Sequence, residues 1–375
     1  MAEIIELEDQ IEKVILVGVS EQDGDDAEDS VAELAELVRT AGAVVVGTLI
    51  QKRELMHPGT YVGTGKVAEI AAMIAERGAT GIVCDDELSP AQLKNLEQML
   101  DTKVMDRTLI ILDIFAARAT TSEGKIQVEL AQLKYRLSRL TGLGRSMSRL
   151  GGGIGTRGPG ETKLETDRRH IMRRVSALKE ELSEIEKRRD FSRRRRKKDG
   201  IMTAAIVGYT NAGKSTLINA LTGSEVTARN RLFETLDLTS RALTLSDSRE
   251  VRVIDTVGFI RRLPHQFIEA FKSTLEEAIQ ADILIHVIDS SSPEMENHIT
   301  VVRKLLEELG CGDKPVIGVF NKIDIANDIH PGKHGFSHFV SISAKSGEGM
   351  DDLIKEIEEV LPGKKRSVRL LIPYS

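Results

Sequence analysis

The feature that most constrains the fold of this 375-residue chain is an apolar run, MTAAIVG, that leads through a Gly-flanked turn into a helix-forming stretch. The turn carries Gly208, Gly213, Lys214 and Ser215 in the spacing G-x-x-x-x-G-K-[ST]. Backbone N–H groups in such a turn, together with the positive end of the following helix, attract phosphate oxygens. A strand, this turn and a helix in that order therefore predict an α/β domain with a phosphate-binding loop.

Three further motifs follow in order, each directly after a predicted strand. DTVGF (255–259) follows VRVI, NKID (321–324) follows PVIGVF, and SAK (343–345) follows FVSI. Any one of these short motifs could be an ordinary turn. All of them in the right order, each after a strand, indicate a nucleotide-binding domain of the Ras-like P-loop class.

The NKID motif predicts which base is bound. The Asp324 carboxylate can accept hydrogen bonds from both N1–H and the 2-amino group of guanine, whereas adenine offers neither donor there. A site built on that double hydrogen bond strongly rejects a base that lacks it. Guanine is therefore the predicted base, with Asn321 and Lys322 bracing base and loop and the Ala344 N–H directed to guanine O6. We expect the nucleotide to contact Gly208, Asn211, Ala212, Gly213, Lys214, Ser215, Thr216, Asn321, Lys322, Asp324, Ser343, Ala344 and Lys345.

The same motifs predict the chemistry at the phosphates. Lys214 is expected to reach the β- and γ-phosphates, Ser215 and Asp255 to ligate Mg²⁺, and the Gly258 N–H to sense the γ-phosphate. The predicted reaction is in-line attack of water on the γ-phosphate of Mg·GTP, which gives GDP and phosphate. Lys214, Gly258 and Thr235, which lies between the first two motifs, are the candidate catalytic residues.

The segment 225–239 is the predicted switch that orders around the γ-phosphate. Thr235 is the preferred Mg²⁺ ligand within it, Thr239 is the competing one, and a role of Thr235 as a simple turn cap is the further alternative. Phe259 stands where many GTPases carry the Gln that orients the attacking water. Because a phenyl ring cannot do this, we expect slow unassisted hydrolysis, with help from the backbone, a displaced side chain, an ion or a partner.

Residues 1–120 alternate short β-rich runs with stretches of helical periodicity. This alternation predicts a small N-terminal α/β domain with a mostly parallel sheet. Ser89-Pro90 has the pattern of a helix N-cap followed by a first-turn Pro. The predicted strands are 13–19, 43–50 and 80–86, and the predicted helices are 26–41, 66–78 and 89–100.

Residues 121–199 differ from the rest of the chain in residue pattern and in charge. The pattern predicts an amphipathic helix before Leu150. In Leu150–Glu165, six Gly and a Pro are expected to exclude a helix. A second long helix is predicted from about 161 to 196. The region holds 22 Lys and Arg against 11 Asp and Glu, a balance of +11, whereas the remainder carries −17 and the whole chain −6. We expect a projecting basic hairpin that contacts a polyanion, with a solvated helical face as the alternative.

The Gly-rich tip of this hairpin is the predicted contact, because Gly lets main-chain N–H groups approach a ribose-phosphate backbone closely. The candidate RNA-binding residues are Arg145, Arg149, Arg157 and Lys163. A mobile connector is the alternative role for this tip.

Composition excludes several other classes of protein. Cys84 and Cys311 are the only cysteines and have no partner spacing, which excludes a disulfide scaffold and a four-thiolate zinc site. The longest apolar runs are too short to cross a bilayer, and the acidic N-terminus lacks a basic signal region, so we expect a cytoplasmic protein. The expected parts are an N-terminal α/β domain (1–120), the basic hairpin (121–199), a Ras-like G domain (200–362) and a short C-terminal tail (363–375).

Four long blocks of the chain resemble one family, the HflX GTPases of the Obg-related translation factors. These blocks are YVGTGKVAEI, GKIQVELAQLKYRLSRLTGLG, GGGIGTRGPGETKLETDRR and DTVGFIRRLPHQFIEAFKSTLEE. The resemblance implies a GTPase that binds the large ribosomal subunit, hydrolyses GTP faster there and takes part in splitting stalled ribosomes under stress. It also implies that the Gly-rich tip approaches ribosomal RNA near the peptidyl-transferase region. We expect a monomer that associates with ribosomes and takes GTP or GDP as its small ligand.

The resemblance bears on single positions as well. In potassium-activated relatives an Asn at the place of Asn211 helps to hold K⁺ beside the phosphates, and the alternative is that Asn211 only shapes the loop. Two features depart from the family pattern. Glu234 stands where many members have a small residue, which weakens the switch assignment, and the sequence stops at VRLLIPYS where many members continue into a further small domain.

Two other functions fit parts of the sequence. YVGTGK suggests a second phosphate loop and a nucleotide-driven RNA-remodelling module, but only Gly63, Gly65 and Lys66 are present, so a turn entering a helix explains it better. A GTP switch for a protein partner without RNA contact is the other alternative, and the +11 region argues against it.

Overall fold

The computed structural model describes residues 11–21, 26–148, 159–198, 200–223, 232–233, 239–262, 277–326 and 331–361. The chain forms two compact units. Unit 1 comprises residues 1–192 together with 229–237 and 260–273, and unit 2 comprises residues 193–228, 238–259 and 274–375. Two short stretches from the second half of the sequence therefore belong to unit 1.

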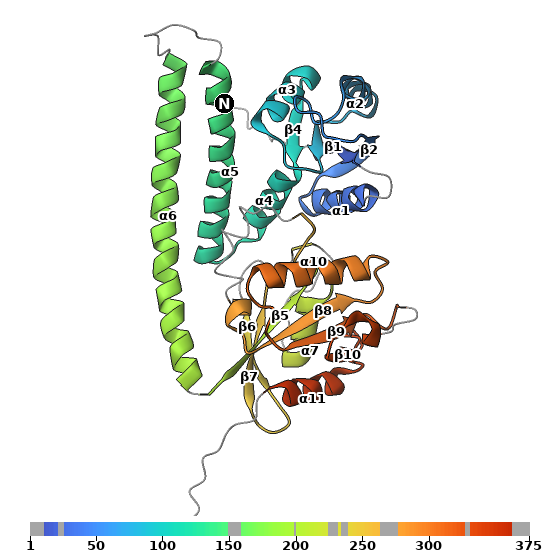
Figure 1. Ribbon diagram of the computed structural model, residues 1–375, viewed down its shortest axis with the longest axis vertical. Coiled ribbons are helices and arrows are strands. Elements are labelled where there is room, and N and C mark those ends of the chain that lie inside the picture. Colours follow the sequence, from blue (N-terminus) through green and yellow to red (C-terminus); the bar gives the residue numbers. More distant parts are fainter. Residues whose placement is uncertain are drawn as a thin grey trace, which may run out of the picture. The chain divides into compact units, whose positions relative to one another are not determined.

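Unit 1 contains a parallel sheet with the strand order β2-β1-β3-β4 (Figure 1). Neighbouring parallel strands need a crossover connection, which helices supply here. The strands are β1 (Lys13–Ser20), β2 (Val44–Lys52), β3 (Gly81–Cys84) and β4 (Lys103–Asp106), and the helices are α1 (Ala27–Thr40), α2 (Thr64–Arg77), α3 (Pro90–Leu100) and α4 (Arg107–Arg118). This arrangement confirms the predicted α/β class with a parallel sheet.

Local signals predicted the start of α3 correctly. The Ser89 hydroxyl accepts a hydrogen bond from the Gln92 N–H at 3.3 Å, and the Gln92 side chain accepts one from the Ser89 N–H at 2.9 Å. Pro90 opens the helix, where its missing N–H has no intrahelical partner to lose. By contrast, β4 and α4 were not predicted. Strand β4 has only two apolar residues, Val104 and Met105, between charged ones.

The strand order of unit 1 reverses direction once. The chain passes from β1 to β2 on one side and then to β3 on the other side of β1. In open α/β sheets, ligands bind beyond the carboxyl ends of the strands at such a reversal. In unit 1 this place lies beyond β1 and β3, where Asp85 and Asp86 directly follow the last residue of β3.

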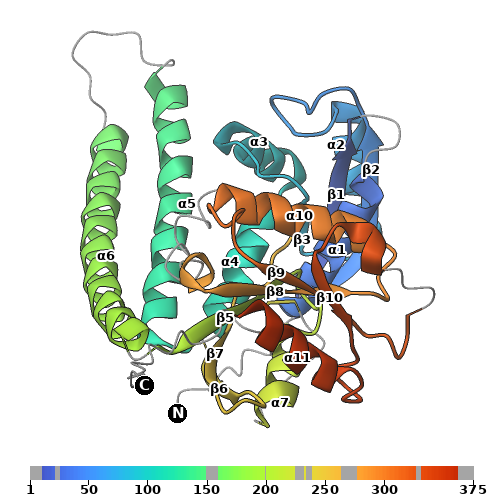
Figure 2. The same ribbon diagram turned by 60° about the horizontal axis from the view of Figure 1, so that its bottom comes forward.

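Two long antiparallel helices follow, α5 (Ser122–Ser148) and α6 (Pro159–Lys198), and they lie side by side (Figures 1 and 2). Leu130 of α5 packs with Leu178 and Leu182 of α6, and the Arg174 guanidinium donates to both carboxylate oxygens of Glu129 at 2.7 and 2.8 Å. The predicted exclusion of helix from Leu150–Glu165 is wrong for its last part. Since α6 begins at Pro159, the Pro opens this helix and does not prevent it.

Unit 2 contains a six-stranded sheet in the order β10-β9-β8-β5-β7-β6, parallel except for the β6–β7 pair. The strands are β5 (Met202–Gly208), β6 (Ser240–Thr244), β7 (Glu250–Asp255), β8 (Ile283–Asp289), β9 (Val316–Asn321) and β10 (His338–Ser341). The helices are α7 (Lys214–Thr222), α10 (Met295–Glu308) and α11 (Met350–Val360), with a short 3₁₀ turn η1 (Pro331–His334). The main core cluster of this unit is formed by alternate residues on one face of the sheet together with α7 and α11, and a smaller cluster of Ile288, Phe320 and Ile299 of α10 forms separately.

Within the ranges that the structure describes, no helix combines the length and the apolar character that crossing a membrane would require.

Candidate nucleotide-binding and catalytic site

The turn between β5 and α7 needs its two motif glycines for different reasons. At Gly208 a Cβ atom would lie 2.3 Å from the Val287 carbonyl oxygen, so β5 can lie this close to β8 only with Gly at that position. Gly213 has φ +94°, and a Cβ there would lie 2.3 Å from the Asn321 Nδ2. The turn thus packs closely against the backbone of the neighbouring strand β8 and against the Asn321 side chain of β9.

Lys214 is the first residue of α7 and is buried inside this turn. Its ammonium donates to the carbonyl oxygens of Gly208 at 3.1 Å and Tyr209 at 2.8 Å. Burial lowers the pKa of this ammonium to about 8, against the attraction of Asp255, which acts in the opposite direction. A cation is therefore held at the centre of the loop that was predicted to bind phosphate.

Ser215 and Asp255 lie next to each other, as predicted. The Ser215 hydroxyl is 3.4 Å from Asp255 Oδ2, at the point where β7 ends. Strand β7 is the parallel neighbour of β5, so the ends of both strands meet at one edge of the sheet. Thr239, the alternative metal ligand, precedes β6, and its carbonyl oxygen accepts from the Asp255 N–H at 2.9 Å.

The DTVGF segment lies along the phosphate-binding loop. The Phe259 N–H donates to the Gly208 carbonyl at 3.1 Å, and the Thr210 N–H donates to the Phe259 carbonyl at 2.8 Å. A Cβ at Gly258 would lie 2.9 Å from Lys214 Nζ, so this Gly stands directly beside the ammonium. The Phe259 ring is buried, which leaves its side chain no access to an attacking water.

Asn321 connects the NKID and SAK motifs to the phosphate-binding loop through hydrogen bonds. Its amide donates to the Ala212 carbonyl and accepts from the Ala344 N–H, each at 2.9 Å. The Lys322 ammonium pairs with Asp289 at 2.6 Å, and the Asp324 carboxylate is exposed. Of the SAK motif, Ser343 and Ala344 are buried and Lys345 is exposed. Asn321 thus connects three predicted motifs at the carboxyl edge of one sheet.

Several predicted residues are not part of this description. Thr235, Arg149 and Arg157 lie outside the described residues. Arg145 and Lys163 lie in α5 and α6, but their side chains are also outside the description. Of the remaining loop residues, Asn211 has a left-handed φ of 63°, and Thr216 lies in the first turn of α7.

The structure also shows functional contacts that sequence reasoning missed. Asp289 holds the Lys322 side chain, and its position directly after an apolar strand could have signalled this. In YVGTGK, Gly63 caps α2 and its N–H donates to Gln51 Oε1 at 2.8 Å, while the Lys66 ammonium pairs with Glu69 at 2.6 Å. This Gly-rich turn is therefore the start of a helix, as the sequence favoured.

Three family models match successive parts of the chain. They are described as the GTP-binding GTPase N-terminal region over residues 28–116, the GTP-binding GTPase middle region over 118–196, and a 50S ribosome-binding GTPase over 203–322. A crystal structure described as the complex of SsGBP with GDP is 28% identical, with a TM-score of 0.50, and covers 92% of this chain and 98% of that chain.

Close relatives share the whole length of these regions. The GTPase HflX of Lacrimispora saccharolytica is 57% identical over 375 residues, which is 100% of this chain and 89% of the relative. The GTPase HflX of Escherichia coli is 42% identical over 366 residues, which is 96% of this chain and 86% of the relative. With these relatives and with the GTPase motifs assembled at one edge of its sheet, this chain belongs to the HflX family of GTPases, which bind and hydrolyse GTP.

Proposed function

We propose that this GTPase acts on the large ribosomal subunit, binds it through the basic α5–α6 hairpin, and uses GTP hydrolysis in splitting or rescuing stalled ribosomes under stress. The observation that supports this most is the excess of cations in residues 121–199, 22 Lys and Arg against 11 Asp and Glu, several of which are exposed on α6. The exposed ones are Arg168, Arg169, Arg173, Arg174, Lys179, Lys187, Arg188 and Arg195. Rows of exposed cations bind nucleic-acid phosphates by releasing the counterions of the polyanion. The description of the matching G-domain family as 50S ribosome-binding supports this choice of partner. Such a role would bring the protein, as a monomer, to ribosomes in the cytoplasm.

The proposed nucleotide site uses the groups that the structure assembles. Lys214 would exchange its two carbonyl acceptors for phosphate oxygens, and the Gly258 N–H beside it would meet the γ-phosphate. The exposed Asp324 carboxylate would accept from guanine, while Asn321 keeps the base loop aligned with the phosphate loop.

Mg²⁺ fits the donor set at the phosphate end. The Ser215 hydroxyl and the Asp255 carboxylate are hard oxygen ligands 3.4 Å apart, and Mg²⁺ is usually held by one or two such groups plus phosphates. When bound, the ion would neutralise charge on the β- and γ-phosphates. Thr235 remains the preferred additional ligand, with Thr239 as its competitor next to Asp255.

The buried Phe259 supports a partner-dependent reaction. Since its ring cannot orient water, slow basal turnover would rise when a partner completes the site. We propose that the large subunit is that partner, and that K⁺ held with the help of Asn211 supplies further charge. A rate that is equal in K⁺ and Na⁺ buffers would remove the ion from this scheme.

The decisive experiment measures GTP hydrolysis with and without large ribosomal subunits. We expect stimulation, and its loss when Arg145, Arg149 and Arg157 are all replaced by Glu, while GTP affinity and basal turnover are kept. The matched control makes the same charge change at three cations that the structure shows to be exposed, Arg39, Lys304 and Lys355, and should leave stimulation intact. Wild-type co-sedimentation of the first triple variant with the subunit would reject the hairpin tip as the contact.

Salt dependence separates the remaining alternatives. Binding through phosphates weakens steeply as salt rises, whereas a protein contact without RNA responds little. ATP turnover by a chain that lacks residues 201–375 would instead favour the second-nucleotide alternative.

A further inference from the structure

Helix α6 has an inner face that packs against α5 within unit 1. Leu178 and Leu182 of α6 are buried beside Leu130 of α5. One turn further along this face, the Arg189 guanidinium pairs with Glu123 of α5 at 2.5 Å. Helix α5 in turn contacts α3 and α4, and α6 lies on its outer side (Figures 1 and 2). These contacts fix which side of α6 is turned toward the rest of unit 1.

Phe191 stands on the opposite, outer face of α6. It follows Leu182 by nine residues, which is about two and a half turns at 3.6 residues per turn, so its side chain points away from α5. The exposed fraction of Phe191 is 73%, against 42% for Phe339, the next most exposed aromatic side chain among the described residues. Phe191 is also the only Phe, Tyr or Trp in the sequence of α6. This ring therefore takes no part in the packing of the two helices.

Cations lie beside this ring on the outer face. Lys187 and Arg188 are exposed and precede Phe191 by four and three residues, a spacing that makes side chains neighbours on a helix surface. Lys187 pairs with Glu184 at 2.7 Å, and such an exposed ion pair is weak. The Arg188 guanidinium has no ion-pair partner in the part of the chain that the structure describes. Arg173, five turns before Phe191, is exposed on the same side.

This set of side chains fits single-stranded RNA. Proteins that bind RNA stack unpaired bases on aromatic rings and place cations on the neighbouring phosphates. A base stacked on Phe191 would bring its phosphates toward Lys187 and Arg188, so all three side chains would gain a partner. An apolar pocket of a protein would cover the ring but would leave the two cations beside it without acceptors, which is costly. The charge around the ring therefore favours RNA as its partner.

We infer that Phe191 stacks on an unpaired base of the large-subunit RNA, with Lys187 and Arg188 on the phosphates beside that base. The inference rests on the proposed function, because it names the chemistry by which the α5–α6 hairpin would hold its ribosomal partner. It adds a second contact to the one proposed at the Gly-rich tip. Phe191 lies 32 residues after Pro159, the first residue of α6, which is about 48 Å along the helix axis at 1.5 Å per residue.

The test measures the affinity of the full chain for purified large ribosomal subunits, with a non-hydrolysable GTP analogue bound. Phe191→Ala should weaken binding by about fivefold to a hundredfold, as the loss of one base–aromatic stack usually does. Phe191→Tyr and Phe191→Trp keep a ring and should bind nearly as well as the wild type. Phe191→Leu keeps apolar surface without a ring, so it should bind like Phe191→Ala.

Salt dependence separates the ring from the cations. Phe191→Ala removes no charge, so the slope of log affinity against log salt concentration should stay as in the wild type. Arg188→Ala removes a phosphate contact and should reduce that slope by about one. The matched control is Leu55→Ala, which truncates an apolar side chain of unit 1 that is exposed to the same fraction, 73%. It should change neither the affinity nor the slope.

Chemical probing of the bound subunit identifies the base. We expect an unpaired base of the RNA that the wild type and Phe191→Tyr protect and that Phe191→Ala leaves reactive. An identical protection pattern for the wild type and Phe191→Ala would overturn the inference.

Two further results would overturn it as well. One is wild-type affinity of Phe191→Ala for subunits that the wild type binds. The other is wild-type affinity of Phe191→Leu, which would indicate an apolar protein pocket in place of a base. Denaturant unfolding supplies the check on the chain itself, because a loss of stability in Phe191→Ala as large as that for a buried Phe would show that the ring packs within the protein and would also overturn the inference. Absence of wild-type binding would instead reject the proposed function, and this inference with it.

Discussion

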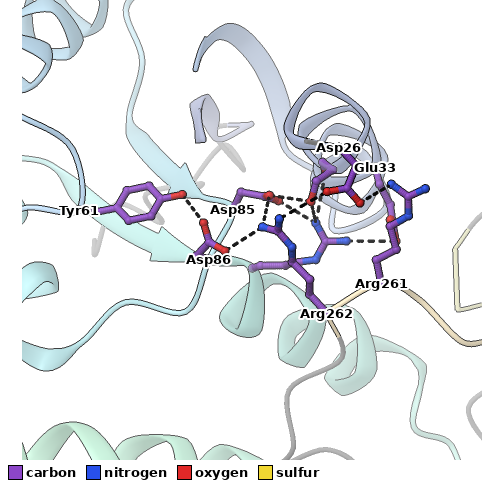
Figure 3. Close-up of polar contacts among 9 residues, drawn as sticks. Asp26, Glu33, Tyr61, Asp85, Asp86, Arg261 and Arg262 are labelled. Carbon is purple, nitrogen blue, oxygen red and sulfur yellow. Dashed lines mark hydrogen bonds and ion pairs between the residues drawn. The ribbon is translucent and has the colours of Figure 1, made fainter. Parts of the chain in front are cut away.

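The two sheets of this chain differ in the charge that lies where the helix after the first strand begins. In unit 2, α7 begins after a Gly turn with the Lys214 ammonium, which suits an anion, while Asp255 and Asp289 at the ends of β7 and β8 contact Ser215 and Lys322. In unit 1 the helix starts at the carboxyl edge carry carboxylates: Asp26 precedes α1, and Asp106 caps α4 by accepting from the Leu109 N–H at 3.0 Å. The same topology therefore binds phosphate at the carboxyl edge of one sheet and a guanidinium at the carboxyl edge of the other (Figure 3).

The comparison shows what the fold contributes and what the residues contribute. The fold places the ligand site at the carboxyl edge in both sheets, because parallel strands all end there. The residues at the helix starts decide the sign of the ligand. Asp106 occupies the Leu109 N–H at the start of α4, whereas the Asp26 carboxylate makes no capping hydrogen bond and pairs with Arg261. Single substitutions at these turns should therefore remove or increase the difference between the two sheets in the ligand that they bind.

The largest expected effect comes from removing the cation of the unit 2 loop. Lys214→Ala should lower GTP turnover by roughly a hundredfold to a thousandfold, as loss of one preorganised electrostatic group usually does. Lys66→Ala is the matched control, because Lys66 also follows a Gly-rich turn but pairs with Glu69 on the helix surface. Single-turnover hydrolysis measures both. Equal losses in the two variants would mean that the turns are not functionally different.

Next in size is the packing of the two Gly-rich turns. Gly208→Ala would place a Cβ 2.3 Å from the Val287 carbonyl and should lower the free energy of unfolding by about 2–3 kcal/mol. Gly65→Ala meets nothing within 4 Å and should stabilise α2 by about 0.5–1 kcal/mol. Denaturant unfolding of both variants measures the difference, and similar values would contradict the close approach of β5 to β8.

A smaller effect is expected at the base. Asp324→Asn replaces an acceptor oxygen with a donor amide, so GTP affinity should fall by roughly tenfold to a hundredfold, as hydrogen bonds to charged groups do when lost. Affinity should shift toward xanthine nucleotides, whose 2-oxo group matches the amide. The control Asp313→Asn alters another exposed carboxylate and should change neither affinity. Unaltered GTP binding by Asp324→Asn would show that this side chain does not read the base.

The smallest effect is a pH dependence of nucleotide binding. Burial lowers the pKa of Lys214 to about 8, below its ordinary value, so the free protein loses this charge as pH rises through that value. Phosphates favour the protonated form, and therefore GTP affinity should fall by about fourfold between pH 7 and 8.5. Lys214→Arg, which stays protonated, should remove this fall. A flat wild-type profile would mean that the ammonium is not buried as described.

The same lowered pKa bears on stability. Because the unfolded chain binds this proton more strongly than the folded one, burial of Lys214 destabilises the fold below pH 8, and stability should rise between about pH 8 and 10. Unfolding measured without nucleotide, for the wild type and Lys214→Arg, separates this contribution from other groups.

The structural features that could be predicted from the sequence are those formed by residues close together in the chain. The start of α3 at Ser89 and Pro90 and the turn between β5 and α7 were predicted because their hydrogen bonds join residues a few positions apart. The prediction for Leu150–Glu165 was partly wrong, since a Pro at the start of a helix and a Pro inside a loop look alike in sequence. Strand β4 was missed because its two apolar residues stand between charged ones, whereas the equally short β3 is apolar throughout.

Only the tertiary structure decided which side chains meet at the unit 1 edge. Asp26, Asp85 and Asp86 read in sequence as ordinary polar residues after strands and before helices, and Arg262 as one more cation. Their contacts join positions 176 to 235 residues apart, so no local pattern records them. By itself, the sequence determined the class of fold and the GTPase motifs, because these show as contiguous runs of residues, and the resemblance of four long blocks indicated the family. The strand order and the folding of 260–262 into unit 1 bring Arg262 to Asp85 and Asp86, because charges attract strongly only once the chain has brought them within a few ångströms.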